Sequence, residues 1–239
     1  MTEKTLKYFD IPSGFTPFFN GINEQSYKKL LYEVIVGSSH PENVILLEID
    51  PWNQKTRIDF LCTEQMLGIN TVCISDIIKK GNKLFYLNNN KEIPIDRIYN
   101  RVIYDELKRK EINYNFRFTE ELDVKWVGHP NWFFKISKYS LPYIKSKYNP
   151  ATYFLNELDE YPSDLEQYVL KPLFSFAGLG VEVNVNRRML DAITDKENYI
   201  LQKKIAYEPF ITTPDIPAKA EIRMMFLWKD KPLLVNNLV

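Results

Sequence analysis

The sequence is poor in the residues that build metal, redox or disulfide sites. It has two cysteines and two histidines in 239 residues, and Cys62 and Cys73 have no Cys or His cluster near them. We therefore expect neither a metal site at these residues nor a disulfide framework, and buried free thiols are the expected state. His40 and His129 each stand alone, and surface or capping roles fit them better than catalysis.

An excess of charge of one sign and a long apolar run are also lacking. The 31 basic residues balance 31 acidic ones, so no overall field favours nucleic acid or an anionic membrane. No apolar run has the length that crosses a bilayer, and the opening residues do not resemble a secretory leader. We predict a cytoplasmic protein that binds neither nucleic acid nor membrane. The sequence does not indicate its oligomeric state.

What the chain has is a globular composition and strand and helix patterns. The first third alternates them: Val44–Ile49 is typical of a buried strand, Gln54–Leu67 has apolar residues at helical spacing before Gly68, and Thr71–Ile74 resembles a second strand. This order predicts an α/β fold with a Rossmann-like lobe over residues 1–105. The turn after the first strand is Asp-Pro-Trp-Asn rather than glycine-rich, so dinucleotide binding is not expected there.

Further elements are expected along the rest of the chain. Helical patterns cover Asp76–Lys80, Trp132–Tyr148, Tyr153–Leu158 and Arg187–Asp195. Strand patterns cover Lys83–Leu87, Glu92–Pro94, Tyr168–Leu170, Val181–Val185, Tyr199–Ile205, Ile222–Trp228 and Pro232–Val239. The last pattern is still apolar where the sequence stops, which is typical of a domain that continues.

Lys171 and the residues after it form the first segment that suggests chemistry. Lys171 closes an apolar strand pattern, and a buried lysine is costly unless an anion pairs with it. The loop Ser175–Gly180 contains Ala177, Gly178 and Gly180, which let backbone N–H groups approach phosphate oxygens. The loop is neither a Walker A motif nor a dinucleotide fingerprint. Two interpretations stay open from these residues alone: a phosphate cradle, or a β-hairpin with Lys171 solvated at its base.

A second segment lies about 30 residues after Lys171. Tyr199–Ile205 is an apolar strand pattern that leads into a polar tip, and taken alone it is typical of an amphipathic strand with a solvated lysine pair. Together the two segments resemble the ATP-grasp superfamily, whose members mostly join a carboxylate to an amine or similar nucleophile through an acyl phosphate. Val169–Pro172 matches its V-x-K-P element, and Leu201–Ile205 matches its hinge strand.

The resemblance implies a set of residues that bind ATP. Lys138 resembles the first ATP lysine, the loop after Lys171 would hold the phosphates, Gln202 would lie near the adenine amino group, and Glu208 would bind the ribose. The implied ATP-binding residues are Lys138, Lys171, Ser175, Ala177, Gly178, Gly180, Gln202, Lys203, Ile205 and Glu208. The alternative for Lys138 is a surface lysine on a helix.

Two arginines complete the resemblance, which spans about residues 44–239. Ala220–Leu227 is similar to the family's strand whose arginine, here Arg223, contacts phosphate or substrate; the alternative is a Glu221–Arg223 ion pair on one sheet face. Ile95–Arg101 is similar to the end of a pre-ATP-grasp domain of the glutathionylspermidine-synthase-like kind, in which Arg101 would face the acceptor or phosphate. Solvated charges at a strand end are the alternative there.

The resemblance implies ATP and Mg²⁺ as cofactors and a small-molecule or peptide carboxylate as substrate. It places an ATP-grasp domain of two α+β subdomains at residues 106–239, with ATP between them and a possibly incomplete C-terminus. The family's metal ligands are carboxylates and a Glu-x-Asn pair, whereas Pro232–Val239 has no carboxylate, so the metal ligands stay unknown. Three hypotheses follow: an ADP-forming ligase, a non-catalytic nucleotide-binding or interaction module with a degenerate metal site, and an α/β interaction domain without nucleotide.

Overall fold

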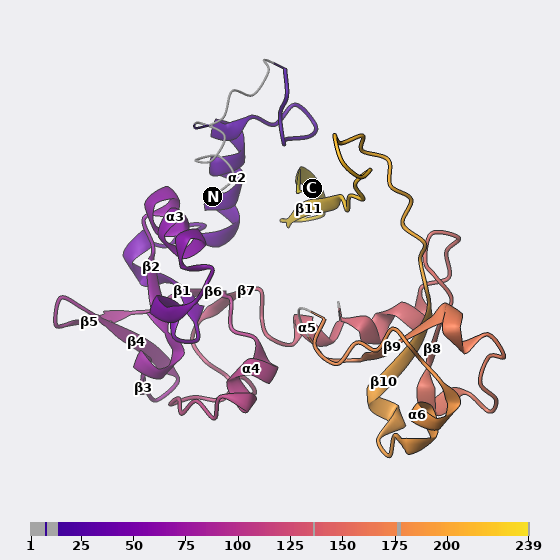
Figure 1. Cartoon of the computed structure of the whole chain (residues 1–239). Helices are drawn as coiled ribbons and strands as arrows, with labels where there is room; N and C mark the ends of the chain where they lie inside the picture. Colours follow the sequence, from indigo (N-terminus) through magenta and orange to yellow (C-terminus); the bar gives the residue numbers. More distant parts are fainter. Residues whose placement is uncertain (1–7, 9–13, 136, 176–177, 239) are drawn as a thin grey trace. The chain divides into compact units, whose positions relative to one another are not determined.

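The computed structural model describes residue 8 and residues 14–135, 137–175 and 178–238. It is a mixed α/β structure with one parallel sheet and several antiparallel sheets (Figure 1). The chain divides into two compact units. We call residues 1–130 with 220–239 the first unit, and residues 131–219 the second unit. No helix in the described residues is long and apolar enough to cross a membrane.

A four-stranded sheet with the order β2-β1-β6-β7 lies at the centre of the first unit. All three of its strand pairs are parallel. Its strands are β1 (Val44–Glu48), β2 (Asn70–Cys73), β6 (Arg97–Asn100) and β7 (Lys125–Val127). Every residue of β1 is buried, which explains its continuous apolar run, because an inner strand of a parallel sheet has both faces covered. Since β7 pairs with β6, the first unit extends past residue 105.

Helices α2 (Glu24–Ile35) and α3 (Arg57–Leu67) supply the apolar side chains of one face of this sheet. Helix α2 begins with a capping box, in which the side chains of Asn23 and Ser26 each accept the other's backbone N–H. Helix α3 ends at Gly68, whose φ of 71° suits glycine and whose N–H donates to the Glu64 carbonyl. The expected helix and its glycine cap are therefore confirmed.

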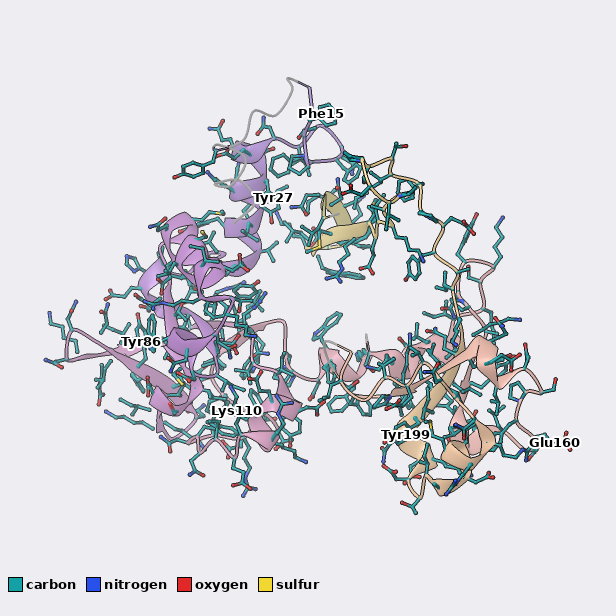
Figure 2. The ribbon with its side chains drawn as sticks, viewed as in Figure 1. Phe15, Tyr27, Tyr86, Lys110, Glu160 and Tyr199 are labelled. Atoms are coloured by element: carbon teal, nitrogen blue, oxygen red, sulfur yellow. The ribbon has the colours of Figure 1, made fainter. Side chains whose placement is uncertain are left out.

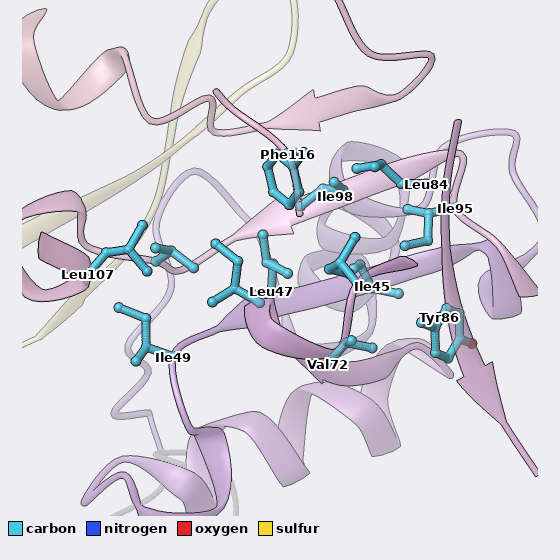
Figure 3. Close-up of a cluster of buried hydrophobic side chains, with 13 residues drawn as sticks. Ile45, Leu47, Ile49, Val72, Leu84, Tyr86, Ile95, Ile98, Leu107 and Phe116 are labelled. Carbon is cyan, nitrogen blue, oxygen red and sulfur yellow. The ribbon is translucent and has the colours of Figure 1, made fainter. Parts of the chain in front are cut away.

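The opposite face of the sheet carries the larger core (Figure 3). Ile45, Leu47 and Ile98 from the parallel sheet meet Leu84 from a three-stranded antiparallel sheet in this core, together with Ile95, which directly follows that sheet. The strands of the second sheet are β3 (Ile78–Lys80), β4 (Lys83–Asn88) and β5 (Lys91–Pro94), and the helix that follows β6 is α4 (Tyr104–Arg109). The expected hairpin around the Asn cluster is confirmed as β4 and β5.

A two-stranded hairpin near the C-terminus also belongs to the first unit. It consists of β11 (Arg223–Trp228) and β12 (Pro232–Leu238), which pair in an antiparallel manner. The Phe19 N–H donates to the Val235 carbonyl at 3.0 Å, so the hairpin is tied to the segment before α2. Most of β11 is exposed. The strand patterns at both positions are confirmed.

The second unit is built on a three-stranded antiparallel sheet with the order β8-β10-β9. Its elements are α5 (Trp132–Lys135), the 3₁₀ helix η4 (Lys138–Tyr143), β8 (Thr152–Phe154), β9 (Tyr168–Pro172), α6 (Arg187–Ala192) and β10 (Tyr199–Lys203). Leu170 and Leu201 pack with Leu190 of α6 in one core. Ile200 and Phe154 form a smaller core with Leu173, against which Leu141 of η4 packs.

Four expectations about local structure are wrong. Residues 78–80, expected to be helical, form β3 because they pair with β4. The helix expected over Trp132–Tyr148 is only α5 followed by η4, a 3₁₀ helix that contains Pro142, which has no N–H to donate. The start of Tyr153–Leu158 lies in β8, and only its middle is a 3₁₀ turn, at Leu155–Glu157. Val181–Val185 is not a strand; it makes one isolated bridge, between Glu182 and Leu170.

Candidate functional site

A chain of hydrogen bonds crosses the sheet of the second unit. The Lys171 Nζ donates to the Gln202 Oε1 at 2.7 Å, and the Gln202 Nε2 donates to the Thr152 Oγ1 at 2.9 Å. The Thr152 hydroxyl in turn donates to the Pro150 carbonyl at 2.8 Å. These contacts link β9, β10 and β8, so two of the residues implied to bind ATP lie side by side.

The strand register explains why Lys171 and Gln202 meet. Lys171 lies opposite Ile200, and Gln202 lies opposite Val169, so Lys171 and Gln202 are diagonal neighbours on one face of the antiparallel pair. Gln202 is only 6% exposed, which makes its amide a buried polar group that needs both of its partners. The acceptor of the lysine ammonium is therefore a neutral oxygen, which carries no charge to offset that of the lysine.

Burial lowers the pKa of Lys171 below the ordinary value for a lysine. Desolvation is the cause, because removing an ammonium from water disfavours its charged form. An anion that reached Lys171 would oppose this effect and raise the pKa again. The electrostatics of this position therefore favour a negatively charged partner.

Lys138 approaches the same region from the first residue of η4. Its Nζ donates to the Ser175 carbonyl at 2.8 Å and to the Ser175 Oγ at 3.0 Å. Leu141, one turn later in η4, packs against Ile200, the residue opposite Lys171. Helix η4 thus lies against the sheet face that carries Lys171, and Lys138 holds the start of the loop that follows β9.

The loop after β9 has features of both structures expected from its sequence, a β-hairpin and a phosphate cradle. Leu170 and Glu182 exchange two backbone hydrogen bonds of 2.9 Å, so the chain turns back on β9 as in a short hairpin. Gly178 and Gly180 have φ values of 76° and 71°, which glycine adopts readily. Lys171, however, is bonded to Gln202 rather than only solvated. Ala177 lies outside the described residues.

The remaining residues implied to contact adenine and ribose lie at and after the end of β10. The Lys203 N–H donates to the Ala151 carbonyl at 2.8 Å, so this donor is already used within the sheet. Ile205 is 55% exposed, and Glu208 is exposed in the segment that follows. The structure thus places these three residues on one short stretch of chain beyond Gln202, with Ile205 and Glu208 open to solvent.

The two arginines assigned to catalysis lie in the first unit. Arg223, in β11, donates from its Nε to the Glu221 Oε1 at 2.6 Å, which is the ion pair named as its alternative role. Arg101 follows β6, and its guanidinium carbon lies 6.0 Å from the centre of the Phe60 ring. Arg223 is therefore already neutralised on the surface, whereas Arg101 stacks beside an aromatic side chain.

A metal site does not emerge from the residues that the structure describes. Within that part of the chain, no group of three or more His, Cys, Asp or Glu side chains gathers that could hold an ion. A hollow of about 450 Å³ adjoins Thr152 and is lined by residues 141–153, but neither Lys138 nor Lys171 lines it. The polar cluster of Lys171, Gln202 and Thr152 is therefore defined by its hydrogen bonds and not by this hollow.

Sequence reasoning did not assign a role to Thr152 or to Glu48. The signal for Thr152 was its Pro-Ala-Thr segment, and the structure shows it as the partner of Gln202. The signal for Glu48 was a carboxylate inside the apolar run Val44–Ile49, and the structure buries it at the end of β1.

Comparisons with known proteins add no assignment to this geometry. No protein-family model matches the sequence, and a search of curated proteins found no match. Any functional assignment therefore rests on the residues and contacts described above.

Proposed function

We propose that the second unit binds ATP, with its phosphates near Lys138, Lys171 and the loop after β9. The observation that carries this proposal is that two lysines approach one sheet face and are both held by neutral oxygens, Lys171 by Gln202 and Lys138 by Ser175. The Lys171 ammonium, whose acceptor is the neutral Gln202 amide, keeps charge available for an anion with several oxygens, and Lys138 lies at the start of the adjacent loop. A triphosphate is such an anion.

The order of motifs along the chain selects ATP among phosphate ligands. In the proposed complex the adenine lies near Gln202 and the backbone of residues 203–205, and the ribose lies near Glu208. Ile205 is 55% exposed and offers an apolar surface for a base. Phosphate oxygens would replace the Gln202 and Ser175 oxygens as acceptors for the two lysines. Each lysine would then exchange a hydrogen bond to a neutral oxygen for a stronger one to a negatively charged oxygen.

We further propose that the protein is an ADP-forming ligase that joins a carboxylate to an amine or thiol. The γ-phosphoryl group of ATP would pass to a carboxylate oxygen, which releases ADP and forms an acyl phosphate. The nucleophile would then attack the acyl carbon and release inorganic phosphate. In such a reaction the lysines position the phosphates and offset their charge, and no side chain has to act as the nucleophile. Mg²⁺ would offset further phosphate charge in enzymes of this class, but no ligand for it is assigned here.

The binding proposal is tested by thermal unfolding of the full chain with ATP and Mg²⁺. A ligand at about 100 times its Kd stabilises the folded state by about 2.7 kcal/mol, which is a measurable rise in melting temperature. Lys171→Met keeps the apolar stem of the side chain and should reduce the affinity for ATP at least tenfold. Lys145→Met is the matched control, because Lys145 is an exposed lysine of the same unit whose Nζ donates to the nearby Pro142 carbonyl at 3.1 Å. An unchanged melting temperature of the wild-type chain would refute ATP binding.

A non-catalytic nucleotide-binding module is the second candidate, and the Arg223–Glu221 ion pair favours it. An arginine that stabilises a transferring phosphoryl group directs its charge at that group, whereas the Nε of Arg223 donates to Glu221 at 2.6 Å, where a carboxylate offsets part of that charge. The two candidates differ in turnover: a ligase forms ADP when the carboxylate is present and continues to release it over many cycles when a nucleophile is present as well. A chain that binds ATP but releases no ADP with any carboxylate and amine pair would support the module.

A further inference from the structure

The strand order of the parallel sheet creates a second place where a ligand can bind, in the first unit. The chain runs from β1 outward to β2 and then returns to β6 on the other side of β1. The connection that leaves β1 leads to β2 on one side of the sheet, and the connection that leaves β6 leads to β7 on the other side. The two connections therefore diverge between β1 and β6. In open α/β sheets, ligands bind at the carboxyl ends of the strands at such a topological switch point.

Two charged residues stand at this point. Glu48 is the last residue of β1, and Arg101 directly follows β6. The Arg101 N–H donates to the Leu47 carbonyl at 2.9 Å, which continues the ladder in which Leu47 lies opposite Asn100. Glu48 and Arg101 are thus neighbours across the strands, and alternation places both on the face covered by α3. Phe60 of α3, beside Arg101, lies on that face.

Glu48 is buried without a cation close enough to form an ion pair. It is 6% exposed, and its Oε1 accepts the Ile49 N–H at 2.8 Å. Among the described residues, no salt bridge joins Glu48 or Arg101 to any partner. A buried carboxylate without a countercharge is costly, and an arginine fork beside it is suited to a planar carboxylate. The charge of Arg101 lowers the pKa of Glu48, yet no salt bridge joins the two groups, so an ammonium at Glu48 and a carboxylate at Arg101 would each add a direct ionic contact.

We propose that the switch point between β1 and β6 binds a small molecule of the α-amino acid type, with its ammonium at Glu48 and its carboxylate at Arg101. Neighbouring strands lie about 4.8 Å apart, so Glu48 and Arg101 stand on adjacent strand ends that one small molecule can reach together. The bound ammonium forms an ion pair with Glu48, and the bound carboxylate pairs with the guanidinium. This inference concerns the first unit alone and does not depend on nucleotide binding.

The ionisation of Glu48 gives the proposed site a pH dependence. Desolvation raises the pKa of Glu48 to about 7; the Ile49 N–H and Arg101 lower it, Glu106 raises it, and Lys110, which follows α4 (Figure 2), lowers it. Below this value Glu48 is neutral and offers no charge to an ammonium. Affinity is therefore expected to increase from pH 6 to pH 8.

The test is a titration of the full chain at pH 8 with each common L-amino acid by calorimetry. For an amino acid that binds, two analogues are titrated as well: the amine without the carboxylate and the acid without the amine. We expect at least one amino acid to bind and both of its analogues to bind at least tenfold more weakly. Failure of every amino acid in the panel to bind would overturn the proposal, as would an analogue that binds equally well.

Variants decide whether the binding occurs at the switch point. Glu48→Gln and Arg101→Gln should each reduce affinity at least tenfold, while Lys108→Gln and Arg109→Gln, on α4, should stay within threefold of the wild type. Glu48→Gln keeps the shape of the side chain and an oxygen for the Ile49 N–H, and Arg101 is exposed, so both variants should fold. Unchanged binding in both site variants, or an equal loss in the α4 controls, would overturn the assignment.

Discussion

Replacing Gln202 with leucine tests whether the polar cluster of the second unit is a coupled set. The substitution removes the acceptor of the Lys171 ammonium at 2.7 Å and the donor to Thr152 at 2.9 Å. A hydrogen bond to a charged group contributes about 1.5–3 kcal/mol and a neutral one about 1 kcal/mol. Because Lys171 is only partly buried, water can replace part of the lost hydrogen bond in the variant. We therefore expect the free energy of unfolding to decrease by about 2–4 kcal/mol at pH 7.

The expected loss depends on pH through Lys171. Its pKa in the folded chain is lowered by burial, so the unfolded chain binds more protons and stability increases as pH rises toward the ordinary lysine value of about 10.4. Without Gln202 the ammonium has lost its acceptor, and this effect becomes larger. The deficit of the variant should therefore shrink between pH 7 and pH 10.

The assay is urea unfolding combined with hydrogen exchange of the β9 and β10 amides, which reports the opening of this sheet in particular. Gln167→Leu is the matched control, because Gln167 is an exposed glutamine beside β9 and should lose less than about 0.5 kcal/mol. A Gln202→Leu deficit below about 1 kcal/mol, or one that does not change with pH, would refute the coupling of Lys171 to Gln202.

Two further predictions concern single positions. Gly180→Ala should cost about 1–3 kcal/mol more than Gly178→Ala in urea unfolding, because both glycines have positive φ but only at Gly180 would a Cβ lie 2.8 Å from the Pro172 Cγ. Equal losses would contradict that close approach. Glu48→Gln should remove a pH dependence: since the pKa of Glu48 is raised to about 7 in the folded chain, the folded state binds the extra proton and wild-type stability falls as pH rises from about 4.3 to 7. Over that pH range, the free energy of unfolding of the variant should change by about 3 kcal/mol less than that of the wild type. Identical slopes of stability against pH would contradict the burial of the carboxyl group.

Much of the first unit could be predicted from local patterns in the sequence. The apolar run Val44–Ile49 contains β1, and the helical spacing before Gly68 corresponds to α3 and its cap. These signals are local, because a buried inner strand is apolar throughout and a left-handed cap favours glycine. The error at Ile78–Lys80 has the opposite origin: its pairing with β4 is tertiary, and three residues carry too little pattern to show it.

The candidate sites depend more strongly on register, which the sequence does not show. Lys171 and Gln202 were chosen singly from motifs, and their contact follows from the pairing of Lys171 with Ile200 across the sheet. Glu48 was read as part of an apolar strand because its neighbours are apolar. Only the order of strands and the ladder between β1 and β6 bring Glu48 beside Arg101. The motifs single out residues one at a time, whereas the contacts between them follow only from the fold.

The neutral side chain at Gln202 connects the stability of the second unit to its proposed ligand. An amide oxygen satisfies a hydrogen bond of the Lys171 ammonium but leaves its positive charge in place. A carboxylate at the same point would neutralise that charge, raise the pKa of Lys171 and compete with an incoming phosphate. With the amide, Lys171 stays a partly buried cation whose pKa is lowered by desolvation. A phosphate that replaced the amide oxygen would supply a countercharge where partial burial makes it stronger than in water, so the free energy gained on binding would be larger than for a solvated lysine.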